Sequence, residues 1–207
     1  EGVVGILYPK PMRVNHREFY EYDPLLGWKK KAQAQRVNIT EEFRAYEHTN
    51  SKGIRGGEYP YLKRSNEYRI LILGDSFAEG YTVEFQDLFS EKLKYILNCR
   101  NDGIHYETIN AGTVGYSTDQ ELLFFRYEGY KYHPDLVILM FYQNDVWDNA
   151  STTEMFSKYK PLYKLDHNEQ LIITNVPAPK ERPQDARNKA ELKNWDEYLK
   201  KNFRFYS

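Results

Sequence analysis

The chain has 207 residues, which is long enough for one domain with a sizeable hydrophobic core. Its 29 basic and 30 acidic residues nearly cancel, so the charge gives no basis for binding nucleic acid or an anionic membrane surface. No apolar run approaches the ~18 residues that span a bilayer, and the single cysteine, Cys99, excludes internal disulfides and CxxC metal sites.

The N-terminal part of the chain, residues 1–67, is polar and interrupted by prolines and glycines. Short alternating segments such as VNITEEFRAY (residues 37–46) predict a few short strands joined by loops. We therefore expect residues 1–67 to form a small β-rich extension to an α/β domain that comprises residues 68–207.

The next part of the chain alternates between strand and helix patterns. Apolar segments predict strands over residues 68–73, 105–110 and 135–142, and helical spacing predicts helices over residues 87–98 and 118–132. This alternation implies βαβ units and a parallel sheet. We expect a flavodoxin-like three-layer α/β/α fold. Such a sheet has about five strands, so three strands indicate an N-terminal portion of the domain, incomplete at its C-terminus.

The pattern changes after residue 150. Residues 159–177 predict an inserted β-hairpin that turns at residues 166–169. The charged segment 184–206 has the spacing of an amphipathic helix.

Small or polar residues follow each of the three predicted parallel strands. They are Gly74-Asp75-Ser76, the segment NAGTVGYST (residues 110–118) and the segment QNDV (residues 143–146). The carboxyl ends of parallel strands lie at one edge of a sheet, where open α/β sheets bind ligands. We therefore expect the Ser76 hydroxyl to lie where the other two loops can reach it.

These three segments together resemble the blocks of the SGNH (GDSL) hydrolase family. The family nucleophile lies in a Gly-Asp-Ser motif after the first strand, which matches Ser76. The family's glycine loop matches Gly115, with Gly112 as the lesser candidate, and its oxyanion-hole asparagine matches Asn144. Tyr142 stands where the third block usually has glycine. The resemblance covers residues 68–150 and extends to NSKGIRGGEYP (residues 50–60), which is similar to the lead-in of larger bacterial members.

The resemblance implies a serine-dependent esterase or acyltransferase that needs no cofactor. Ester cleavage requires an activated hydroxyl and hydrogen-bond donors aimed at the oxygen that becomes negative. Ser76 would attack, while the backbone N–H groups of Ser76 and Gly115 and the side-chain amide of Asn144 would bind the oxyanion. The substrate would be a small-molecule or glycan acyl ester, or a lipid-like one, and the 19 tyrosines suit contacts with sugars.

Other interpretations remain open. Singly, Ser76 could be a helix cap, Gly115 a turn residue and Asn144 a cap. The chain could also be a catalytically inactive SGNH-like module that binds glycan or assists assembly. A flavodoxin-like phosphate-binding domain is disfavoured, because no glycine-rich phosphate fingerprint follows the first strand.

The catalytic base is missing from the expected place. In this family it is a histidine in an Asp-x-x-His motif late in the chain. The one such motif here ends at His105, which begins the second strand, roughly 17 Å from the active edge. The other histidines lack the motif: His16, His48, His133 and His167. We expect the base to lie outside these residues or to come from another chain.

The sequence offers little support for a metal site, because no two histidines are spaced for ligation on a helix. The acidic residues near the strand ends are better explained as turn and cap residues. The resemblance to larger bacterial members favours an extracytoplasmic location, and the oligomeric state is open.

Overall fold

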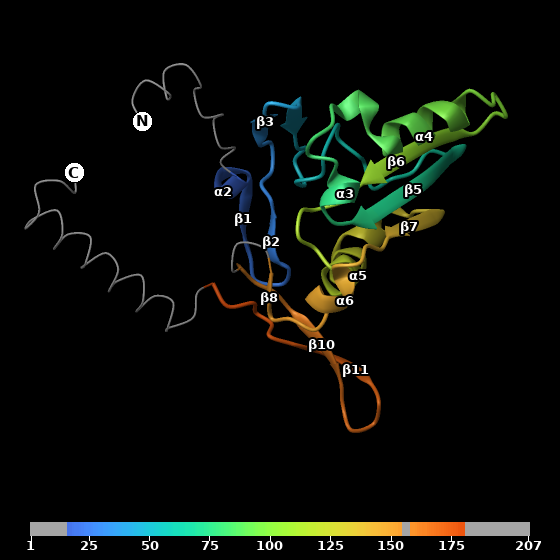
Figure 1. Cartoon of the computed structure of the whole chain (residues 1–207). Coiled ribbons are helices and arrows are strands. Elements are labelled where there is room, and N and C mark those ends of the chain that lie inside the picture. The colour runs from blue at the N-terminus through green and yellow to red at the C-terminus, as the bar shows by residue number, and fades with distance from the viewer. Residues whose placement is uncertain (1–15, 155–157, 181–207) are drawn as a thin grey trace, which may run out of the picture.

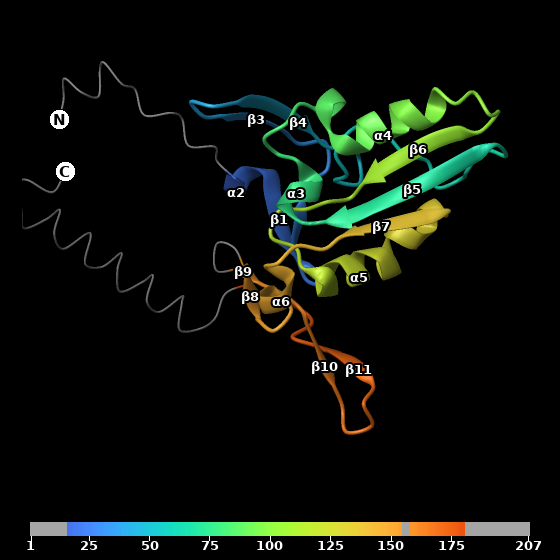
Figure 2. The same ribbon diagram turned by 45° about the vertical axis from the view of Figure 1, so that its right-hand side comes forward.

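The computed structural model describes residues 16–154 and 158–180 (Figure 1). Its centre is a three-stranded parallel sheet of order β6-β5-β7, formed by β5 (Glu67–Gly74), β6 (His105–Asn110) and β7 (Leu136–Met140). Figure 2 shows α4 (Phe89–Asn98) on one face of this sheet and α5 (Thr118–Tyr127) on the other. The layers and the parallel sheet agree with the α/β/α fold predicted from the sequence.

The central strand β5 is buried on both faces because apolar side chains occupy consecutive positions. Ile70 and Ile72 pack with Ala78 on the side of α4, whereas Leu71 and Leu73 pack with a second cluster that reaches α5. Successive strand residues point to opposite faces, so an unbroken apolar run suits a strand covered by helices on both sides.

Four short helices connect or follow these elements. They are α3 (Ser76–Glu79), η1 (Phe85–Asp87), η2 (Gly129–Tyr132) and α6 (Asp145–Asp148). The helix predicted over residues 118–132 is shorter than expected. The observed helix α5 ends at Tyr127, and the chain continues as the 3-10 turn η2. The close packing of Gly129, where a Cβ would lie 2.9 Å from the Leu71 side chain, accompanies this change of direction.

The N-terminal part of the described chain forms two antiparallel hairpins after the short helix α2 (His16–Phe19). The first pairs β1 (Tyr20–Asp23) with β2 (Gly27–Lys30), and the second pairs β3 (Gln35–Ile39) with β4 (Arg44–His48). The hairpins share a core with the α/β part. Trp28 packs with Val114 and Tyr116, which lie in the loop after β6. The short strands expected from the sequence are present here.

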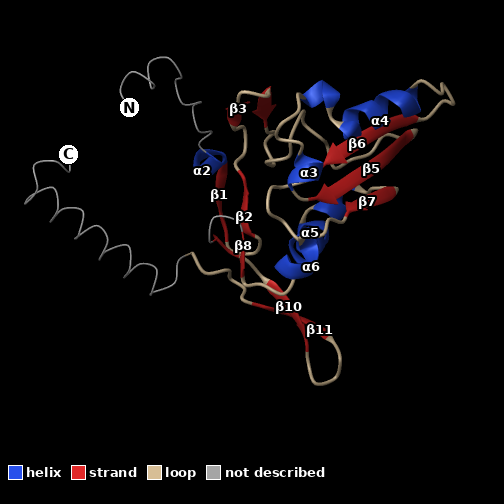
Figure 3. Ribbon diagram, viewed as in Figure 1, coloured by secondary structure: helices blue, strands red, loops and turns tan. Residues whose placement is uncertain are grey.

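Two further antiparallel pairs of strands follow α6 (Figure 3). One pairs β8 (Thr153–Glu154) with β9 (Lys158–Tyr159), and the other pairs β10 (Leu162–Leu165) with β11 (Leu171–Thr174). The predicted turn is present, because the Asp166 carboxylate accepts hydrogen bonds from the backbone N–H groups of Asn168 and Gln170, both at 2.8 Å. The helix predicted over residues 184–206 lies outside the described residues.

Candidate active site

Three loops leave the carboxyl ends of the parallel strands on the same side of the sheet. In register, Ile72 of β5 lies beside Asn110 of β6, and Gly74 of β5 lies beside Met140 of β7. The chain leaves all three strands at this edge, which confirms the predicted convergence of the strand ends. Ser76 follows the central strand, Gly115 lies in the loop after β6, and Asn144 lies in the loop after β7.

A tight turn carries Ser76 from β5 into α3. Gly74 permits this turn, since a Cβ there would lie 2.6 Å from the Ala78 Cβ and 3.0 Å from the Met140 Cβ. The Asp75 carboxylate caps the helix by accepting a 2.8 Å hydrogen bond from the Phe77 N–H. Asp75 is thus the structural cap, as its position in the sequence predicted, and Ser76 is not.

Ser76 itself is half-buried at the first position of α3. Within the described ranges, neither its hydroxyl nor its backbone N–H makes a hydrogen bond. A hydroxyl and an N–H at the start of a helix that have no hydrogen-bond partner within the protein are available to a bound molecule.

The loop after β6 is held by several contacts and carries Gly115 in a turn. The Tyr116 N–H donates to the Thr113 carbonyl at 3.0 Å, and Gly115 has φ of 76° at the third position of this turn. A positive φ at that position is typical of a type II turn and favours glycine. The Gly115 N–H has no hydrogen-bond partner in the described part of the chain. Gly112 has a different structural role, because a Cβ there would lie 2.5 Å from the Glu79 backbone nitrogen.

Asn144 lies at the start of α6, but its side chain does not cap that helix. The side-chain Nδ2 donates to the Asp148 Oδ2 at 2.9 Å, which uses one of its two N–H bonds. The Oδ1 atom is buried without a partner among residues 16–154 and 158–180. Tyr142 fits where the family usually has glycine, since its φ is not positive and its ring packs 4.4 Å from that of Phe77.

The surroundings of the site are acidic. Burial raises the pKa of Asp75, although hydrogen bonds from the Phe77 N–H and the Asn144 side chain oppose this effect. Burial followed by the charges of Asp145 and Asp75 raises the pKa of Glu121 to about 8. Glu121 is 1% exposed, and neither carboxylate oxygen has a hydrogen-bond partner in the described residues. Glu121 is therefore mostly protonated at neutral pH. Sequence reasoning missed it, because an acidic residue in an amphipathic helix normally faces solvent.

The described histidine side chains do not reach Ser76. His105 is the first residue of β6 and pairs with Glu67, the first residue of β5, so it lies at the opposite edge of the sheet. His133 precedes β7, and His167 lies in the turn between β10 and β11. His48 stacks on Tyr46. None of these four histidines hydrogen-bonds to Ser76, which agrees with the sequence-based rejection of the motif that ends at His105.

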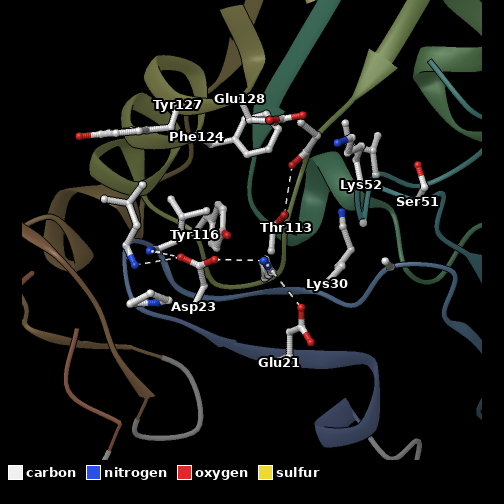
Figure 4. A pocket seen from close by; sticks show the side chains of 18 residues that line it. Glu21, Asp23, Lys30, Ser51, Lys52, Thr113, Tyr116, Phe124, Tyr127 and Glu128 are labelled. Atoms are coloured by element: carbon white, nitrogen blue, oxygen red, sulfur yellow. Dashed lines mark hydrogen bonds and ion pairs between the residues drawn. The ribbon is translucent and has the colours of Figure 1, made fainter. Parts of the chain in front are cut away.

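A cavity of about 420 Å³ lies beside the loop after β6 (Figure 4). The β1–β2 hairpin and the Ser51–Ile54 segment form one side, and α5 and the loop after β6 form the other. Figure 4 shows Thr113 and Tyr116 of this loop facing the cavity. None of Ser76, Gly115 and Asn144 lines it. The cavity is therefore a neighbour of the candidate site and not the site itself.

Comparison with known families identifies the chain. A model described as the GDSL-like Lipase/Acylhydrolase family matches residues 72–202, which is more than half of the sequence. The chain belongs to this family. Membership in this GDSL family confirms the SGNH resemblance and the fold class, and it supports hydrolysis of ester bonds. A search among curated proteins found no match.

Two further findings concern the described residues. No group of three or more His, Cys, Asp or Glu side chains among them is placed to hold a metal ion. Nor does any helix in residues 16–154 and 158–180 combine the length and apolarity that crossing a membrane requires.

Proposed function

We propose that this GDSL-family protein is a serine esterase, or an acyltransferase of the same chemistry, with Ser76 as its nucleophile. The proposal depends on the position and hydrogen bonding of the Ser76 hydroxyl. Its hydroxyl stands at the start of α3, directly after the central strand, and makes no hydrogen bond with another described residue. A serine used only as a cap would bond to the helix backbone, and Asp75 already does so here.

In the proposed reaction the Ser76 Oγ attacks the ester carbonyl carbon and gives its proton to a base. The tetrahedral oxyanion accepts hydrogen bonds from the backbone N–H groups of Ser76 and Gly115 and from the Asn144 side chain. The alcohol then leaves with a proton, and water or another alcohol takes the acyl group from Ser76. The backbone N–H groups of Ser76 and Gly115, which have no hydrogen-bond partner among the described residues, support these roles.

The base is expected to be a histidine from an Asp-x-x-His block, as in other members of the family. The acidic side chains around the site would favour the protonated form of such a histidine, because nearby negative charge stabilises an imidazolium. Asp75 and Asp145 carry charge of this kind, since both raise the pKa of Glu121.

We further propose that the acyl group is carried by a carbohydrate or a lipid-like molecule. An alternative remains a catalytically inactive module of the same fold that binds glycan or assists assembly. None of the four described histidines hydrogen-bonds to Ser76, and this observation favours the alternative.

Ester hydrolysis tests the proposal. The whole protein should hydrolyse p-nitrophenyl acetate, and Ser76→Ala should lower the rate by at least about 1000-fold. Ser65→Ala, which changes an exposed serine in a turn, is the control and should retain the full rate. Equal turnover by Ser76→Ala and the wild type would remove Ser76 from the mechanism. A wild-type protein that neither hydrolyses the ester nor reacts with a fluorophosphonate probe would favour the inactive module.

A further inference from the structure

The Glu79 side chain links α3, the helix that begins with Ser76, to the loop that carries Gly115. It is the last residue of α3, and its side chain is fully buried. Its Oε2 atom accepts a 2.7 Å hydrogen bond from the backbone N–H of Val114, the residue directly before Gly115. One carboxylate therefore fixes the spacing between the helix that begins with Ser76 and the turn of Gly115.

The β1–β3 strands hold this carboxylate in place. The Glu79 Oε1 atom accepts hydrogen bonds from the Tyr20 hydroxyl at 2.7 Å and from the Arg36 Nη2 at 2.8 Å. Lys30 lies 3.9 Å from the Oε2 atom and also donates to the carbonyl of Gly112 in the same loop. Each of these partners lies on a different strand of the two N-terminal hairpins.

Further buried groups of the N-terminal region hold the C-terminal end of α3, where Glu79 lies. Arg55 donates to the carbonyls of Glu79 and Gly80, both at 2.8 Å, which satisfies backbone groups at the helix end. Glu47 pairs with Arg36 and lies 3.7 Å from Arg55, so a second carboxylate balances these cations. Among the described residues, the Glu47 carboxylate makes no hydrogen bond or ion pair with α3 or with the loop after β6.

A buried network of this kind is not explained by stability alone. Desolvating several charges is costly, and well-packed apolar residues of similar volume are often equally stabilising. What hydrogen-bonded charges do supply is a fixed orientation, because each bond has a narrow range of distance and angle. The groups oriented here are the helix of Ser76 and the loop of Gly115.

We propose that Glu79 is a positioning residue of the esterase site, and that the N-terminal hairpins serve catalysis by holding its carboxylate. The inference rests on the proposed roles of Ser76 and Gly115. It assigns Tyr20, Lys30 and Arg36 of these hairpins a part in the reaction. Glu79 itself is not required to touch the substrate.

Glu79→Gln tests this inference with little change in shape. A glutamine has one accepting oxygen, so it cannot accept both from Val114 and from the Tyr20 and Arg36 pair. We expect kcat for p-nitrophenyl acetate to fall by about 10- to 100-fold with KM within about threefold, because a small displacement of positioned groups affects the transition state most. Glu47→Gln is the matched control: the Glu47 hydrogen bonds from Arg36 and Asn38 both go to the Oε2 atom, so a glutamine can keep them, and kcat should change by less than about threefold.

Hydrogen exchange gives a readout that does not depend on activity. In Glu79→Gln the amide oxygen is expected to face the Arg36 cation, so the NH2 group faces the Val114 N–H and cannot accept from it. The segment 111–117 should then exchange faster than in the wild type, whereas Glu47→Gln should leave that segment unchanged. Should Glu79→Gln fail to fold, Tyr20→Phe deletes only one hydroxyl and should lower kcat by roughly three- to tenfold.

The outcomes separate this inference from the proposed function. Wild-type kcat in a folded Glu79→Gln or Tyr20→Phe protein would overturn it. Equal losses of kcat and of protection from hydrogen exchange in the Glu79 and Glu47 variants would also overturn the inference, because the network would then act only through global stability. A wild type without esterase activity would refute the proposed function. The exchange of segment 111–117 would then decide: faster exchange confined to Glu79→Gln supports the positioning role, and equal exchange in both variants overturns it.

Discussion

Gly112→Ala gives the sharpest test of how closely the loop after β6 must approach α3. The added Cβ would lie 2.5 Å from the Glu79 nitrogen and 2.6 Å from both the carbonyl carbon and the Cβ of Ala78. Unstrained contacts between carbon atoms are about 3.5–4.0 Å, so the shortfall is roughly 1 Å. Two of these atoms belong to the backbone of α3 and cannot rotate away, so the loop itself must retreat. Overpacking of this kind costs about 1–3 kcal/mol.

The displacement should affect activity as well as stability. A shift of about 1 Å in a positioning element can cost roughly 100-fold in rate, and the displaced loop carries the Gly115 N–H. We expect a lower midpoint of urea unfolding and a kcat for p-nitrophenyl acetate reduced by about 100-fold. Gly57→Ala is the control, because nothing lies within 4 Å of a Cβ at Gly57. A Gly112→Ala protein with wild-type kcat would refute the reasoning, even if its stability fell.

Two predictions concern the buried charges near the site. The pKa of Glu121 is about 8, above its ordinary value of 4.5. Between pH 4.5 and pH 8 the folded state therefore holds one more proton than the unfolded state, and the free energy of unfolding falls as the pH rises through this range. Glu121→Gln should therefore flatten the decline in unfolding free energy between pH 5 and pH 8.5 and stabilise the protein at pH 8.5 by about 1–4 kcal/mol; an unchanged slope in urea titrations would contradict this. Lys160 is fully buried against the carboxylate of Asp119, so Lys160→Met should cost about 3–5 kcal/mol. The double variant with Asp119→Asn should recover part of that loss, and full stability of Lys160→Met would show that the pair contributes nothing.

The sheet could be predicted from the sequence because its signals are local. The apolar run of Ile70 to Leu73 and the polar residues directly after it determine both the buried strand and the turn at Ser76. The strand predicted over residues 105–110 coincides with β6. The end of α5 was less predictable, since apolar spacing continues to Tyr132 although the chain changes to a 3-10 turn after Glu128.

The buried network around Glu79 could not be predicted in this way. Charged residues in short polar strands normally face solvent, and nothing near Lys30 or Arg36 in the sequence indicates otherwise. Their burial depends on partners that are far away in the chain: Arg36 and Glu79 are 43 positions apart, and Lys30 and Gly112 are 82 apart. Such contacts arise only when the hairpins fold against the loop after β6, so they are a property of the tertiary structure.

Strand β7 has a practical consequence for work with this protein. In the part of the chain that the structure describes, β7 has a hydrogen-bonded neighbour on one side only, and Leu136, Val137 and Leu139 are all at least 38% exposed. An open strand edge with large aliphatic side chains can recruit another extended segment, including one from an identical molecule. Fragments chosen for expression should be screened for self-association first, since aggregation through this edge would lower the apparent activity of every variant.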